Sequence, residues 1–211
     1  MIETRDDFVQ VLATLGWLPW KDEVSDQCAS IRIGGIVLEM VMGYRDFRQN
    51  IHVEAERQVI RISMGGSVTT DAVSTAYTLF FHPRKRYSES CIILQREAPE
   101  IKKAHVTFED VRLMSDDLKN WAASCKIEAG LADLRKLSTN SVGALPAWHL
   151  AALAAYGDVT TLHRYLNAFK AGDRLGFAMY ITEEVLSIAL AFAERRKSDP
   201  VWLPKTPRLR V

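Results

Sequence analysis

The sequence predicts an α+β fold, in which an N-terminal helix precedes an antiparallel sheet of five or six strands, a long covering helix and a C-terminal helical subdomain. Three observations support this prediction. The first 16 residues have a helical hydrophobic period, residues 30–107 alternate between apolar and polar positions, and residues 108–197 return to helical spacing. Strands that follow one another through short connections pair antiparallel, and their alternation predicts one packed and one solvated face. Helices are expected to cover the packed face.

The first helix has a defined start and end in the sequence. Thr4 and Asp7 have the spacing of a capping box, in which each side chain accepts a hydrogen bond from a backbone N–H at the helix start. Apolar residues then recur at helical spacing up to Leu15, and Gly16 is placed to end the helix. Residues 17–20, which include two tryptophans, are predicted to form a turn.

Glycine pairs punctuate the predicted sheet. Gly34-Gly35 separates two apolar runs and therefore predicts a β-hairpin. Gly65-Gly66 is predicted to end a strand that starts at Ile60. The remaining strands are predicted at residues 51–55, 72–81, 90–95 and 105–108.

The helical part of the chain begins after residue 108. Ser115 is predicted to cap the longest helix, which continues to about residue 137 and is followed by a small-polar linker at residues 138–143. Three further capped helices are expected within residues 146–194. Their predicted boundary residues are Pro146 and Gly157, then Asp158 and Gly172, and finally Thr182.

Changes in composition divide the chain into three parts. Residues 1–137 are predicted to form the α+β sheet domain, and residues 138–197 a helical subdomain packed on it. Residues 198–211 contain three prolines and no hydrophobic period, so they are predicted to form an extended tail.

Charge and composition argue against several classes of protein. The 211 residues carry a net charge of +1, which argues against a nucleic-acid partner because phosphate binding needs a broad basic surface. No apolar run approaches the ~20 residues that cross a bilayer, and the acidic N-terminus lacks the features of a signal peptide. Cys28, Cys91 and Cys125 lie far apart, which is typical of reduced thiols. A cytoplasmic protein with no membrane partner is therefore expected.

The sequence contains no known catalytic or cofactor motif. The five histidines form no HExxH or HxH pattern, and neither GxSxG nor a phosphate-binding loop with its terminal Lys-Ser/Thr occurs. We therefore expect no catalytic residue, no metal site and no cofactor. An enzyme of an unrecognised type is an alternative hypothesis, with His52, Asp173 and Arg174 in a cleft.

Two clusters of polar residues are candidate partner-binding surfaces. One lies on the solvated face of the predicted sheet, where polar residues alternate with apolar ones. The other is a basic segment at a hairpin tip, a pattern that a solvated turn also explains. The candidate residues are His52, Glu54, Glu56 and Arg61 on the sheet face, and Arg84, Lys85 and Arg86 at the tip.

The C-terminal block carries a distinctive pattern that consists of Gly157-Asp158, Leu162, Tyr165, Phe169, the run from Gly172 to Phe177, and Tyr180-Ile181-Thr182. This pattern resembles the C-terminal signature of a family of uncharacterised bacterial proteins. Small α+β proteins of this kind are similar to immunity proteins of bacterial toxin systems. The first ~135 residues are also similar in outline to effector-secretion chaperones, although the near-neutral charge and the added helices depart from that group.

These resemblances lead to one leading hypothesis and two alternatives. We expect a non-catalytic bacterial protein-binding protein, namely an immunity protein that neutralises a cognate toxin by binding it. The first alternative is a dimeric secretion chaperone or adaptor, whose partner is an effector protein. The second alternative is the enzyme of an unrecognised type. The oligomeric state and the identity of the partner stay open.

Overall fold

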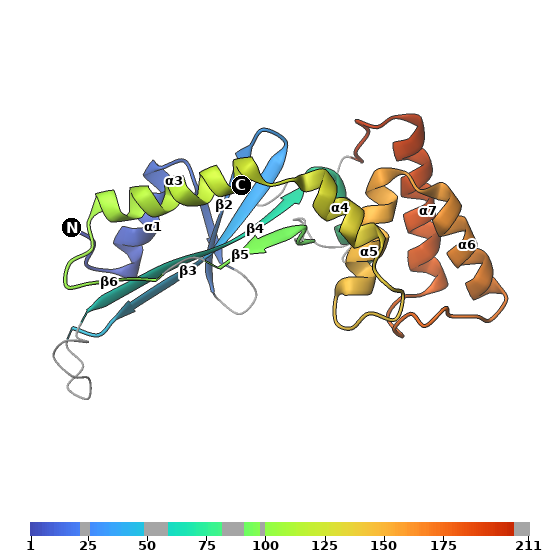
Figure 1. Ribbon diagram of the computed structural model, residues 1–211, viewed down its shortest axis with the longest axis horizontal. Coiled ribbons are helices and arrows are strands. Elements are labelled where there is room, and N and C mark those ends of the chain that lie inside the picture. The colour runs from blue at the N-terminus through green and yellow to red at the C-terminus, as the bar shows by residue number, and fades with distance from the viewer. Residues whose placement is uncertain (22–25, 49–58, 82–90, 98–99, 205–211) are drawn as a thin grey trace. The chain divides into compact units, whose positions relative to one another are not determined.

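The computed structural model in Figure 1 confirms the α+β class. It describes residues 1–21, 26–48, 59–81, 91–97 and 100–204, which form seven helices and a six-stranded antiparallel sheet. The chain divides into two compact units, each made of two separate segments. The first unit comprises residues 1–68 and 94–125, and the second comprises residues 69–93 and 126–211.

The first unit begins with α1 (Arg5–Thr14), whose predicted capping box is confirmed. The Thr4 hydroxyl accepts a hydrogen bond from the Asp7 backbone N–H, and the Asp7 carboxylate accepts one from the Thr4 backbone N–H. Gly16 follows the helix with a φ of 86°, a left-handed conformation that glycine adopts without a steric cost. Residues 17–20 were predicted as a turn, but the structure corrects this, since most of them lie in a strand that pairs with its neighbour.

The sheet follows the order β1-β2-β3-β4-β5, and β6 also pairs with β4. The predicted hairpin at Gly34-Gly35 is confirmed, because Ile33 pairs with Ile36 across it. β6 pairs with the first residues of β4, and β5 pairs with residues in its second half. The two short strands therefore share β4 as a partner. The strands are β1 (Leu18–Lys21), β2 (Gln27–Ile33), β3 (Ile36–Asp46), β4 (Ile60–Thr70), β5 (Leu94–Arg96) and β6 (Ile101–Lys103).

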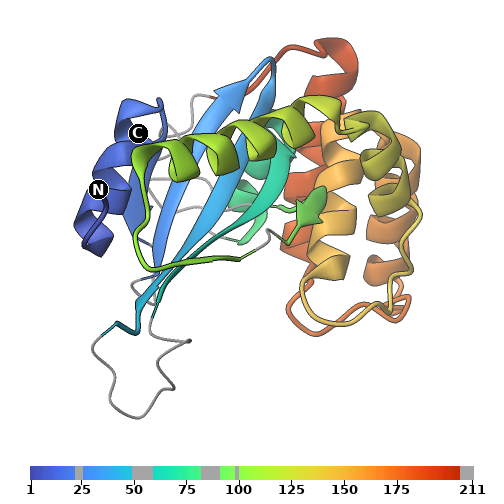
Figure 2. The same cartoon turned by 60° about the vertical axis from the view of Figure 1, so that its left-hand side comes forward.

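Helices α1 and α3 (Phe108–Ser124) lie on one face of this sheet (Figures 1 and 2). The prediction that Gly65-Gly66 ends a strand is wrong, because β4 continues through both glycines. Gly66 is needed where α3 crosses the strand. A Cβ atom at Gly66 would lie 2.5 Å from the Leu118 Cδ1 atom and 3.2 Å from the Trp121 ring, whereas one at Gly65 would meet nothing within 4 Å.

The start and the length of the covering helix differ from the prediction. The helix starts earlier than predicted, because Thr107 caps α3 in a second capping box with Asp110. Ser115, the predicted cap, is instead a buried mid-helix residue whose hydroxyl accepts a 2.8 Å hydrogen bond from the Trp17 indole N–H. The backbone becomes extended at Cys125, so the predicted long helix is divided into α3 and α4 (Ile127–Arg135).

The largest error concerns residues 72–81, which were predicted as a strand but form α2 (Asp71–Phe81). The Thr70 hydroxyl accepts a hydrogen bond from the Val73 N–H at the start of this helix. A short apolar run that is buried on several sides has no clear period, so hydrophobicity alone does not separate a strand from a helix. Residues 51–55 lie outside the described residues, and around residues 105–108 Val106 makes only a single bridge to Ile2.

The second unit is helical, and its predicted caps are confirmed. Asp158 and Thr182 accept hydrogen bonds from backbone N–H groups in the first turns of their helices, and Gly157 ends the preceding helix with a φ of 80°. None of the helices in the described residues is both long and apolar enough to cross a membrane. The unit contains α2, α4, α5 (Leu145–Tyr156), α6 (Val159–Lys170) and α7 (Glu183–Ser198).

The two glycines of β4 provide a matched pair for testing the packing of α3. We expect Gly66→Val to lower the free energy of unfolding by about 2 kcal/mol, because the added atoms overlap Leu118 and Trp121. Gly65→Val is expected to change it by less than about 0.5 kcal/mol, because its Cβ faces open space and valine suits a strand. Urea denaturation measures both values. Equal effects of the two substitutions would contradict the close approach of α3.

Candidate functional site

Only one of the predicted partner-binding residues lies within the described part of the chain. His52, Glu54, Glu56, Arg84, Lys85 and Arg86 lie outside the described residues. Arg61 is in β4, on the face opposite the buried Ile60 and Ile62, and its guanidinium lies 4.7 Å from the centre of the Phe47 ring. This side chain is therefore packed against an aromatic ring.

His149 is a buried residue whose ring nitrogens both bond within the fold. It is 1% exposed, its Nδ1 atom lies 3.0 Å from the Leu134 carbonyl oxygen, and its Nε2 atom lies 3.1 Å from the Tyr165 hydroxyl. Because a carbonyl only accepts, Nδ1 carries the proton and donates it, and Nε2 accepts from the hydroxyl. Burial lowers the pKa of the His149 imidazole below its ordinary value, although the bond to Leu134 opposes this shift. The ring is neutral and both nitrogens have partners.

The thiols of Cys91 and Cys125 are poorly suited to nucleophilic chemistry. Burial raises the pKa values of Cys91 and Cys125, so both remain protonated thiols near neutral pH. Nucleophilic cysteines need the opposite shift, since the thiolate is the reactive form. Among the described residues, no group of three or more His, Cys, Asp or Glu side chains is arranged to hold a metal ion.

Two loops of the second unit lie side by side and form what we call the paired-loop surface, residues 138–144 and 172–182 (Figures 1 and 2). The Thr139 hydroxyl donates a hydrogen bond to the Leu175 carbonyl, and the Tyr180 hydroxyl donates one of 2.7 Å to the Gly143 carbonyl. Gly176 and Asn140 also approach closely, since a Cβ atom on this glycine would lie 3.1 Å from the Asn140 Cβ. The loops therefore form one connected surface.

Arg174 fixes the second of these loops from inside. Its Nη2 atom donates to the carbonyls of Ala178, at 2.9 Å, and Ile181, at 2.8 Å, and its guanidinium lies 5.0 Å from the centre of the Phe169 ring. These local bonds hold the loop in one conformation. Leu175 has a φ of 53°, which a branched side chain rarely adopts and which the surrounding bonds enforce.

The paired-loop surface exposes apolar side chains on this rigid support. Val142 and Met179 are each 80% exposed, and Tyr180 is 43% exposed. Residues 137–149 and 175–182 contain no charged side chain, although a quarter of the whole chain is charged. The absence of charge in these two segments can be seen in the sequence, although it belongs to no known motif.

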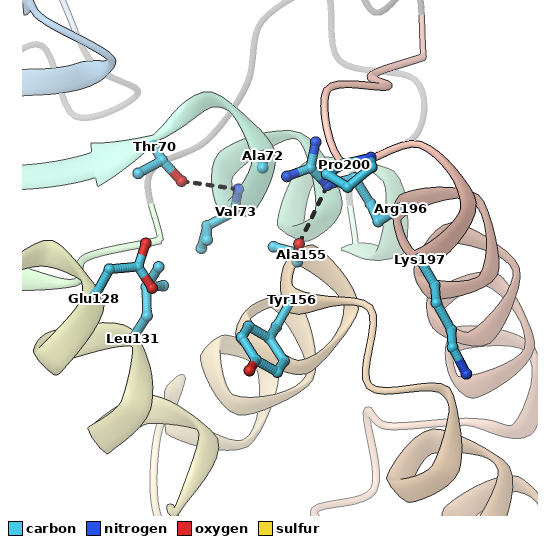
Figure 3. A pocket seen from close by; sticks show the side chains of 10 residues that line it. All are labelled: Thr70, Ala72, Val73, Glu128, Leu131, Ala155, Tyr156, Arg196, Lys197 and Pro200. Carbon is cyan, nitrogen blue, oxygen red and sulfur yellow. Dashed lines mark hydrogen bonds between the residues drawn. The ribbon is translucent and has the colours of Figure 1, made fainter.

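The second unit also contains a cavity of about 580 Å³ (Figure 3). It lies where the first turns of α2 and α4 meet the last turns of α5 and α7. Val73, Leu131 and Tyr156 provide apolar lining, and Thr70 provides a hydroxyl at one side. The volume is within the range of pockets that hold small ligands.

Two opposite charges flank this cavity. The Arg196 guanidinium donates to the carbonyls of Ala155 and Trp202, each at 3.2 Å, and burial lowers the pKa of this group. The Glu128 carboxylate lies on the other side of the open space in Figure 3. The Lys197 side chain points away from the centre.

Comparisons with known proteins identify a family but no function. A family model described as a family of unknown function (DUF6990) matches residues 4–194. Neither the curated proteins nor the solved structures contain a match to the chain.

We expect His149 to make stability pH-dependent. Because the folded state keeps this ring neutral, the unfolded chain takes up a proton that the folded chain does not as the pH falls through the ordinary histidine pKa of about 6.5. The stabilisation is present above this range and is lost below it. The melting temperature is expected to fall between about pH 7.5 and pH 5 less steeply in His149→Gln than in the wild type. The exposed His163→Gln variant is the control and should retain the wild-type slope.

Arg174 is expected to hold the paired-loop surface together. Arg174→Met keeps the stem that packs on Phe169 but removes both bonds to carbonyls, so the free energy of unfolding should fall by about 2 kcal/mol. Arg164→Met is the matched control, because this arginine is exposed and only approaches the Tyr165 ring. Chemical denaturation measures both. An Arg174→Met variant as stable as the control would show that the bonds do not fix the loop.

Proposed function

We propose that this chain, which belongs to the DUF6990 family of unknown function, is a non-catalytic protein-binding protein that recognises one folded partner through the paired-loop surface. The observation that carries the proposal is the exposure of Val142, Met179 and Tyr180 on two loops that are tied to each other. Such exposed apolar side chains are unfavourable in water unless a partner covers them.

The composition of the surface supports a protein partner. Protein interfaces are enriched in tyrosine and methionine and depleted of charged residues at their centres. The paired loops have this composition, with Ser138, Thr139 and Ser141 as uncharged polar residues beside the apolar ones. The local bonds of Arg174 already order the second loop, so binding costs less conformational entropy.

A pre-organised surface favours a folded partner over an unfolded one, since little rearrangement is needed on either side. Among the hypotheses from the sequence, an immunity protein that binds and neutralises a cognate bacterial toxin agrees best with this. Such a protein acts by occupying the toxin and needs no reactive group of its own. The assignment to a bacterial, cytoplasmic immunity protein is part of the proposal.

A dimeric secretion chaperone or adaptor is the second candidate, and a different observation favours it. In the first unit, α1 and α3 cover one face of the sheet, while Leu18 and Val41 are exposed on the opposite face at 41% and 55%. An effector segment would bind there. Light scattering separates the candidates, since the chaperone hypothesis requires a dimer and the immunity hypothesis is compatible with a monomer.

The paired-loop surface can be tested by site-specific cross-linking. A photoreactive residue at position 179 should capture one protein in cells of the source organism, whereas one at position 113, on the exposed side of α3, should not. The captured protein is then purified for binding measurements. Met179→Asp should weaken its binding about 30-fold or more, and Leu113→Asp should change it less than about 3-fold.

The immunity function itself predicts protection. Expression of the captured protein alone should inhibit growth, and co-expression of the wild-type chain should restore growth. The Met179→Asp variant should fail to restore it while keeping the wild-type melting temperature, because position 179 is exposed. A captured protein that is harmless would reject the immunity function. Equal binding by the wild type and by Met179→Asp would reject the surface.

A further inference from the structure

We propose that the cavity of the second unit binds a small zwitterion whose two charges are separated, namely a dipeptide with apolar side chains. Its carboxylate would bind Arg196, its ammonium group Glu128, and its side chains the apolar lining (Figure 3). This site is separate from the paired-loop surface and does not depend on the function proposed for that surface.

Neither charged group of the proposed site, Glu128 or Arg196, is held in an ion pair within the described residues, although Asp199 acts electrostatically on Arg196. Arg196 donates hydrogen bonds to the carbonyls of Ala155 and Trp202. A guanidinium has five N–H donors. The two carbonyl bonds therefore leave three donors, enough for the two-bond geometry that arginine forms with a carboxylate.

The start of α2 would help to bind the carboxylate of the ligand. Thr70 and Ala72 line the cavity at the start of this helix, where the first backbone N–H groups have no partner within the helix. The Thr70 hydroxyl accepts from the Val73 N–H, so its own proton is available to donate. Arg196 and this turn together form the anion-binding side.

The opposite side selects against a simple anion. The Glu128 carboxylate would repel phosphate or acetate, and Arg196 would repel a simple cation. A molecule that carries both charges satisfies both sides, and it leaves the net charge of the site unchanged. The nearby Arg135 lies 3.7 Å from the centre of the Tyr156 ring, so one face of that ring already has a cation.

The lining between the charges suits an apolar side chain. In Figure 3, Val73 lies between Glu128 and Arg196, Leu131 lies beside Glu128, and the Tyr156 ring lies below them. The volume of about 580 Å³ exceeds that of one amino acid and accommodates a dipeptide. Leucyl-leucine is therefore the probe, and leucine, which carries both charges on one carbon, is the comparison.

Isothermal titration calorimetry on the full-length protein tests the site. Leucyl-leucine should bind. Leucine, N-acetyl-leucyl-leucine and leucyl-leucine amide should each bind at least about 10-fold more weakly, since leucine cannot span the two sides and each blocked dipeptide lacks one charge. Glu128→Gln should weaken binding of the free dipeptide by a similar factor and should abolish the penalty for acetylation. Glu194→Gln, an exposed glutamate on α7, is the matched control and should bind as the wild type does.

Each alternative result would overturn the proposal. No binding of leucyl-leucine at about 10 mM means that the cavity is not a site for such zwitterions. Equal binding of free and blocked dipeptides means that the charges do not select the ligand. Binding of inorganic phosphate as tight as that of the free dipeptide identifies a simple anion site instead. Because Glu128 is exposed, a folding defect in Glu128→Gln is not expected, and its melting temperature checks this.

Discussion

The second unit depends on one constraint, which is that α5 has no polar face. Nearly all of its residues are buried, and α2, α4, α6 and α7 pack around it. A helix that is apolar on every side must be surrounded, and His149 is tolerated in it because both ring nitrogens have partners. Both candidate sites adjoin this helix, since one of the paired loops leads into the start of α5 and the cavity is lined by residues at its end.

Much of the fold was predictable from local chemistry. The caps at Thr4, Asp158 and Thr182 and the left-handed Gly157 are local features, because each depends on residues within one turn of the helix end. The predictions failed where contacts between distant residues determine the local structure. Residues 72–81 form an apolar run that suits a buried strand as well as a buried helix, and the hydroxyl of Ser115 is satisfied by a tryptophan 98 positions away.

The candidate sites were harder to predict from the sequence than the fold was. The uncharged segments of the paired loops can be read from the sequence, but their pairing depends on the bonds of Thr139 and Tyr180 to the opposite loop. The cavity combines the ends of four helices that are distant in sequence. The distinctive C-terminal pattern includes the second paired loop, but no charge cluster or motif marks the cavity. Arg61, the one predicted contact residue that is described, packs on Phe47.

The division of each unit into two chain segments has a consequence for synthesis on the ribosome. α2 is made before β5, β6 and α3, which complete the first unit, and long before α5 and α7, on which it packs. Val73, Ala76 and Phe80, which the finished protein buries, therefore wait for partners until the last helix has emerged. During that interval, the nascent chain carries an apolar helix that chaperones of the cell would recognise.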